Sequence, residues 1–116
     1  MDFDHFIVVL LTTPAEPPEL DEETSAAVHD GHLNHLAELH EAGHLLAAGP
    51  LRDPDGRLRG MSVFAVDSEE ARRLSEQDPA VRAGVFDFEV IPWMVPAGAI
   101  GWAPARFPHS VAEAGG

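Results

Sequence analysis

The sequence of 116 residues contains no cysteine, no lysine and no tyrosine. Without cysteine the chain forms no disulfides and has neither thiolate metal ligands nor a cysteine nucleophile. Without lysine it has no Schiff-base chemistry, and without tyrosine it has no phenol to act as an acid. The catalytic groups that remain are histidine, carboxylate, arginine and serine.

Positive charge and long apolar runs are also scarce. Seven arginines stand against twenty aspartates and glutamates, a formal net charge of -13 at pH 7. That charge excludes nucleic acid and anionic membranes as expected partners, because both are negatively charged. The longest apolar run, Phe6–Leu11, is far shorter than the roughly 20 residues of a membrane helix, and the acidic start Met1–Asp4 does not resemble a signal peptide. We expect a cytoplasmic protein that acts on a small molecule.

Hydrophobic periodicity predicts one domain in residues 1–95 and a C-terminal tail in residues 96–116. The order strand, helix, strand, strand, helix, strand is that of a ferredoxin-like α+β fold, in which both helices cover one face of an antiparallel sheet. The predicted strands are His5–Thr12, Leu45–Ala48, Gly60–Val66 and Val85–Pro92. The predicted helices run from Thr24 to about Gly43, with Asp21 or Thr24 as the cap, and from Asp67 to about Gln77.

The tail is rich in glycine, alanine and proline, a composition that predicts loose order. It nevertheless carries Trp102 and Phe107, and Trp93 stands shortly before it. Large apolar groups are unusual in a disordered extension. We therefore expect the segment from Trp93 onward to contribute to a binding cleft, with Trp93 itself as a substrate-binding residue.

The first strand predicts how the protein assembles. Two helices cover only one face of the sheet, yet His5–Thr12 shows no alternation of polar residues that would suit a solvated second face. That second face must then be buried by something else. We expect a homodimer whose interface includes sheet residues from Phe6–Leu11 and Phe86–Ile91.

Five of the seven histidines lie within sixteen positions around the first predicted helix. They show no H-E-x-x-H spacing or comparable signature, so we predict no metal site. Three of them are expected to be exposed polar residues, namely His35, His40 and His44. The polar face of this helix is expected to be solvated and consists of Asp30, Asn34, Glu38 and Glu41.

His32 differs from the other histidines because it is centred on the apolar face of the predicted helix. A polar ring in that position must find a hydrogen-bond partner or lose a kcal/mol or more of desolvation energy. A carboxylate is the natural partner, and Asp78, directly before Pro79 at the end of the second helix, is one candidate that spacing alone does not single out. Gly31 is unfavourable inside a helix, which indicates that another element packs closely beside His32.

Several segments of the chain match a known family when taken together: His32–Leu36 with Leu39, Gly43–Pro50, Ser68–Ala71, Asp78–Pro79 and Val90–Trp93. With them the chain resembles the YciI-like, or YCII-related, family over nearly all of residues 3–93. The resemblance implies a dimeric α+β barrel of ferredoxin-like subunits and a His-Asp pair in a cleft, which maps onto His32 and Asp78. An arginine common in the family three residues before the histidine is His29 here, which we expect to bind substrate.

A carboxylate on one imidazole nitrogen fixes the tautomer and stabilises the imidazolium that forms when the other nitrogen takes a proton. We therefore expect His32 and Asp78 to be catalytic, in a proton transfer that needs no cofactor: elimination, dehydration or isomerisation of a cyclic or aromatic metabolite. The resemblance offers dehydrochlorination and lactone isomerisation as examples. Two alternatives stay open, a non-catalytic dimer that binds a small molecule and a cofactor-free oxygenase on the same barrel fold.

Overall fold

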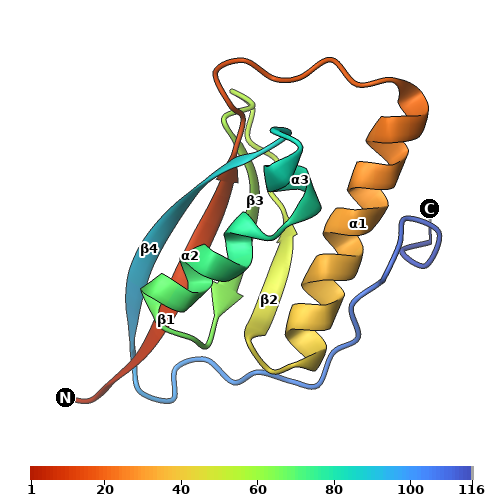
Figure 1. Ribbon diagram of the computed structural model, residues 1–116. Helices are drawn as coiled ribbons and strands as arrows, with labels where there is room; N and C mark the ends of the chain where they lie inside the picture. Colours follow the sequence, from red (N-terminus) through yellow and green to blue (C-terminus); the bar gives the residue numbers. More distant parts are fainter. Residues whose placement is uncertain (116) are drawn as a thin grey trace.

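A computed structural model describes residues 1–115 as a four-stranded antiparallel sheet with its helices on one face (Figure 1). The strand order is β2-β3-β1-β4, which confirms the ferredoxin-like α+β prediction. The strands are β1 (Phe3–Thr12), β2 (Leu45–Pro50), β3 (Leu58–Phe64) and β4 (Asp87–Pro96). The helices are α1 (Glu22–Glu41), α2 (Ser68–Glu76) and α3 (Pro79–Arg82).

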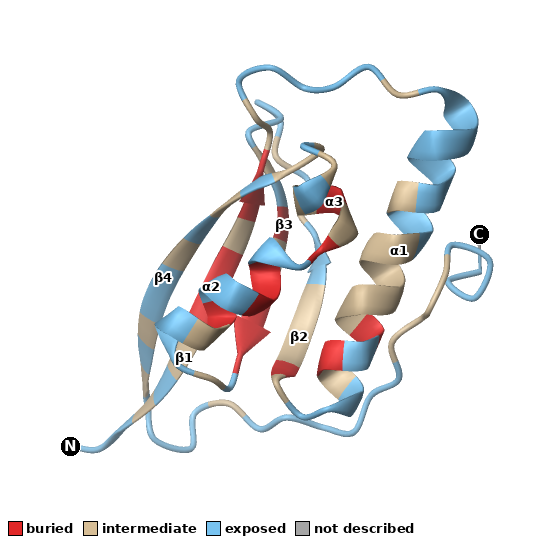
Figure 2. Ribbon diagram, viewed as in Figure 1, coloured by how far each residue is buried: buried red, intermediate tan, exposed pale blue. Residues whose placement is uncertain are grey.

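The core lies between the sheet and the helices. Alternate residues of the central strand β1, Ile7, Val9 and Leu11, point toward the helices because side chains alternate across a strand. They meet Leu39 of α1 and Leu74 of α2 in one buried cluster. Figure 2 shows buried residues along β1 and β3 and where α2 meets α3, whereas the first turns of α1 are exposed.

Helix α1 begins where its sequence signals predict. Asp21 is the N-cap, and its Oδ1 accepts a hydrogen bond of 2.7 Å from the backbone N–H of Thr24. That hydrogen bond lowers the pKa of the Asp21 carboxyl, because it stabilises the charged form. The helix ends at Glu41 with Ala42 as C-cap, and Gly43 follows with a φ of 83°, in the left-handed region that terminates helices.

The segment after α2 contains a helix that the sequence analysis misses. The Asp67 side chain caps α2 by accepting a hydrogen bond from the backbone N–H of Glu70, as its capping-box spacing predicts. Asp78–Pro79 ends that helix and immediately starts α3, with Asp78 as N-cap and Pro79 in the first turn. Asp followed by Pro is a helix-start signal as well as a stop signal, so the pattern was present in the sequence.

The sheet face away from the helices is largely apolar. Phe6 and Val8 of β1 lie on it opposite Trp93 and Ile91 of β4, and Leu10 lies on it opposite Glu89. Ile91 is 40% exposed. Phe86 was predicted to share this face, and that prediction is wrong because Phe86 precedes β4 and packs on the helix side of the sheet.

The tail is more ordered than its composition predicts. It has no helix or strand among residues 97–115, yet it crosses the end of the sheet and runs along the outer side of α1 (Figure 1). Trp102 packs edge-on against Phe6 with ring centroids 5.5 Å apart, while Phe107 lies against the core. Within residues 1–115, no helix is long and apolar enough to cross a membrane.

Candidate active site

His32 and Asp78 are joined by a short hydrogen bond. His32 Nδ1 lies 2.7 Å from Asp78 Oδ2, and the two side chains are 12% and 4% exposed. The prediction that Asp78 accepts a hydrogen bond from His32 is therefore confirmed. Since the carboxylate can only accept, Nδ1 carries the hydrogen and Nε2 keeps the lone pair that takes a proton.

Asp78 is held by the start of α3. Its Oδ1 accepts a hydrogen bond of 2.9 Å from the backbone N–H of Ala80, and the whole residue is 3% exposed. One oxygen therefore caps the helix while the other orients the imidazole. α3 in turn packs against α1 beside Gly31, so the short helix carries the carboxylate directly to His32.

A cleft of about 810 Å³ opens in front of His32, a size that suits a small organic molecule. It lies between α1, the strands β2 and β3, and the tail. Apolar residues from all of these elements line it, including Leu33 and Leu36 of α1, Ala48 of β2 and Phe107 of the tail. Arg106, Pro108 and Val111 also line it, so the tail forms part of the cleft wall through these residues and Phe107, whereas Trp102 does not line it.

The structure places the two predicted substrate-binding residues apart. His29 lies one helical turn before His32 and lines the same cleft. Trp93 pairs opposite Phe6 in the sheet and packs against that ring on the outer face, with centroids 6.1 Å apart. Within one protomer, Trp93 therefore does not reach the cleft that contains His32.

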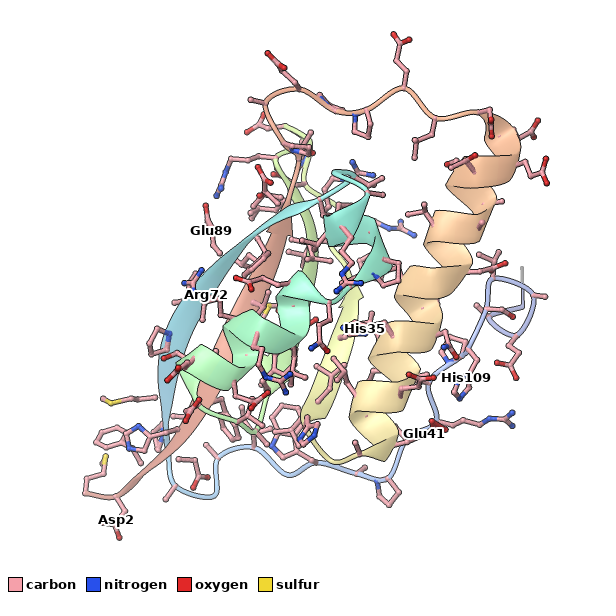
Figure 3. All side chains as sticks on the ribbon, viewed as in Figure 1. Asp2, His35, Glu41, Arg72, Glu89 and His109 are labelled. Carbon is pink, nitrogen blue, oxygen red and sulfur yellow. The ribbon has the colours of Figure 1, made fainter. Side chains whose placement is uncertain are left out.

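His35, His40 and His44 are half-buried, so the expectation that they are exposed is wrong. His35 points toward α2, where its Nε2 lies 2.9 Å from the carbonyl oxygen of Leu74 (Figure 3). His40 stacks on Phe107 with ring centroids 4.1 Å apart and planes only 8° from parallel. The helix period places these residues on one side or the other of α1, but it carries no information about neighbours distant in sequence.

Part of the polar face of α1 binds the tail. Asp30, Glu38 and Glu41 are exposed, as expected of a solvated face, whereas Asn34 is half-buried. Asp30 Oδ1 accepts a hydrogen bond of 2.9 Å from the backbone N–H of Val111. His109 lies with Nδ1 2.6 Å from Asn34 Oδ1 and Nε2 3.0 Å from Glu41 Oε1. Figure 3 shows His109 and Glu41 facing each other between the tail and the helix.

Two cleft residues escaped the sequence analysis. Phe86 packs edge-on against His32, with ring centroids 5.5 Å apart and planes at 68°. The guanidinium of Arg59 lies 5.5 Å from the centroid of the same Phe86 ring. Neither residue belongs to a motif, and only the pairing of β3 with β1 and the approach of α3 bring them beside His32. Among residues 1–115, no group of three His, Asp or Glu side chains is arranged to hold a metal ion.

Fold and site together define a class of protein, namely a ferredoxin-like α+β domain with a largely buried His-Asp pair beside an apolar cleft. The family profile of the YCII-related domain matches residues 7–94. The match covers most of the chain, including His32, Asp78 and all four strands in whole or in part. The chain belongs to the YCII-related domain family.

A solved structure supports the same fold. The 5-chloro-2-hydroxyhydroquinone dehydrochlorinase of Burkholderia phenoliruptrix AC1100, in complex with 2,5-dihydroxybenzoquinone, superposes with a TM-score of 0.52. The two proteins share 19% sequence identity, and the match covers 82% of this chain and 96% of that chain. A search of curated protein sequences gave no match.

Proposed function

We propose that this protein is a small-molecule enzyme in which His32 acts as general base on a cyclic or aromatic carbon acid, in an elimination, dehydration or isomerisation. The observation that carries the proposal is the geometry of the pair. Asp78 holds Nδ1 at 2.7 Å, which leaves Nε2 as the basic nitrogen of a ring that lines the cleft. Proton transfer by a positioned histidine contributes about 10²–10⁴-fold to a reaction rate.

In the elimination, Nε2 takes a proton from carbon and the electrons of that C–H bond form the new double bond. The leaving group, chloride or hydroxide, departs from the neighbouring carbon with its bonding electron pair. His32 becomes an imidazolium, which the Asp78 carboxylate stabilises through the hydrogen bond on Nδ1. The proton then passes from Nε2 to water or to the departing group, which restores the neutral ring.

Two further observations support a substrate with a ring. The cleft walls beside His32 are apolar and include Phe86, which offers its ring to a flat ligand. The structural neighbour from Burkholderia phenoliruptrix AC1100 is a dehydrochlorinase of a chlorinated hydroquinone, and a dehydrochlorination is an elimination of this kind.

The structure also favours a second candidate, in which the pair is purely structural. Asp78 both caps α3 and holds His32, so the hydrogen bond fastens α3 to α1 even if no proton is transferred. In that case the cleft only binds its ligand.

Deuterium exchange separates the two candidates without knowledge of the leaving group. A panel of cyclic ketones, lactones and hydroquinones, including 5-chloro-2-hydroxyhydroquinone, is incubated with the protein in D₂O and followed by NMR and chloride release. We expect protein-dependent exchange or chloride release that His32→Ala removes, while His5→Ala, an exposed histidine outside the cleft, keeps it. Turnover retained in His32→Ala would contradict the proposal and leave the structural candidate.

A further inference from the structure

The charge of the cleft is opposite to that of the rest of the protein. The chain carries twenty aspartates and glutamates and a net charge of -13. Yet within residues 1–115 the cleft is lined by two arginines and two histidines, and by no aspartate or glutamate. The Asp78 carboxylate stands behind His32 and is already engaged by it. A cleft without carboxylates in its lining, in a protein that is otherwise acidic, is suited to a negatively charged ligand.

Arg59 is the residue best placed to bind that charge. Its guanidinium rests over the face of Phe86, which holds it by a cation–π contact and leaves its N–H edge free. Three arginines are engaged by carboxylates: Arg57 by Glu89, Arg73 by Glu70 and Arg106 by Glu113. Within residues 1–115 the other four, Arg52, Arg59, Arg72 and Arg82, make no ion pair, and of these four Arg59 is the one that lines the cleft.

Arg59 and His32 contact the same ring from different positions. Each lies 5.5 Å from the centroid of Phe86, so one small molecule that packs on this ring can meet both groups. A planar guanidinium binds carboxylate oxygens in pairs and binds phenolate oxygen strongly, which fixes the direction in which the ligand lies.

We propose that the ligand of this cleft is an organic anion, a cyclic or aromatic carboxylate or phenolate, and that Arg59 binds its anionic oxygen. The inference rests on the proposed function, because it names the substrate class of the same site. It also assigns Arg59 a role in the reaction. Negative charge that develops on a carbonyl or phenol oxygen as His32 removes the proton is stabilised by the same guanidinium.

Isothermal titration calorimetry with matched pairs of compounds tests the proposal. Benzoate is compared with benzamide, and 2,5-dihydroxybenzoquinone, which is ionised at neutral pH, with its dimethoxy ether, which cannot ionise. We expect the ionised member of at least one pair to bind about tenfold more tightly, as a charge-assisted hydrogen bond should provide. The pair that shows the preference distinguishes a carboxylate site from a phenolate site.

Variants assign the preference to a residue. Arg59→Gln should remove it, Arg59→Lys should keep only part of it, and Arg52→Gln, an exposed arginine outside the cleft, should leave it intact. Circular dichroism checks that each variant is folded. Equal binding of ionised and neutral compounds, no binding of any anion up to millimolar concentration, or a preference that survives Arg59→Gln would overturn the inference.

The two proposals fail differently in these experiments. If anions bind through Arg59 but no compound exchanges deuterium through His32, the substrate class stands as a ligand class and the enzymatic proposal is wrong. If exchange depends on His32 but neutral compounds serve equally well, the enzymatic proposal stands and the role of Arg59 is wrong.

Discussion

Gly31 of α1 lies directly against Pro79 of α3. A Cβ atom at Gly31 would stand 3.2 Å from both Cβ and Cγ of Pro79, closer than such carbons normally approach. Pro79 follows Asp78, so the missing side chain at position 31 allows the carboxylate to reach His32 in the next position of the helix. The glycine that is unfavourable for α1 therefore serves the geometry of the His-Asp pair.

The first prediction concerns this contact. In Gly31→Ala, the gain in helix propensity of about 1 kcal/mol is offset by the displacement of α3, so the free energy of unfolding should change little. Turnover should fall roughly tenfold or more, because small displacements of a catalytic group are costly. Urea unfolding and steady-state kinetics measure the two effects. Ala27→Gly, at an exposed position of the same helix, should show the reverse: lower stability and unchanged turnover.

The second prediction concerns pH. Only a neutral imidazole can accept a proton, so turnover should rise with pH as His32 loses its proton and then level off. Asp78→Asn should lower the plateau at least about tenfold, since an amide does not stabilise the imidazolium. Asparagine caps helices as well as aspartate, so thermal unfolding should change much less. A pH-independent rate would remove His32 from the mechanism.

The third prediction concerns the tail as a wall of the cleft. Deleting residues 105–116 removes Phe107 and leaves all four strands and Trp102 in place. Burial of an aromatic side chain contributes about 1.5–3 kcal/mol of free energy, so loss of Phe107 should weaken ligand binding roughly tenfold or more. Deleting only residues 112–116 keeps Phe107 and His109 and should have a much smaller effect. Equal affinity of both truncated proteins and the full chain would show that the tail is not part of the site.

The fourth prediction is that His40 and His109 hold the tail against α1. His40 has Leu45 O at 2.7 Å from Nδ1 and Ala105 O at 3.1 Å from Nε2, and both ring nitrogens of His109 also face oxygen acceptors. An amide in place of each ring removes these paired contacts and the stacking of His40 on Phe107. Replacing both histidines should therefore loosen the tail.

Hydrogen–deuterium exchange over residues 105–113 measures this docking. We expect faster exchange in the double variant His40→Gln, His109→Gln than in the unchanged protein. His44→Gln, which lies outside these contacts, should keep the protection. Equal protection in the double variant would contradict the prediction.

The fifth prediction is the homodimer. The outer sheet face is apolar, and Ile91 on it is 40% exposed. Apolar faces of this kind are normally covered by another surface. Sedimentation at micromolar concentration should give twice the 12.5 kDa mass of the chain, and Ile91→Arg should shift it to the monomer. Arg82→Glu, an exposed change on α3, should leave the dimer intact. A monomeric native chain would show that the face is not an interface between copies.

Local signals in the sequence predicted the four strands, the helices α1 and α2, and one half of the site. Periodicity located all four strands, although β4 extends to Pro96 rather than Pro92 because its last residues pair with the start of β1. Asp67 and Asp21 were recognisable as caps, since capping depends on neighbours three residues away. His32 stood out because a polar ring on an apolar helix face is anomalous at the level of the helix alone.

Tertiary structure decided the contacts between residues distant in sequence. Arg59, Phe86 and Phe107 join His32 only through strand pairing, the approach of α3 and the path of the tail, none of which has a local signature. Likewise Trp93 was assigned to the cleft from its size, whereas its register opposite Phe6 turns it to the other face, because side chains in a strand alternate. The sequence by itself determined the strands, the helices α1 and α2, and the one histidine on an apolar helix face, since those depend on neighbouring residues. Packing determined what that histidine faces, since that depends on how the whole chain is folded.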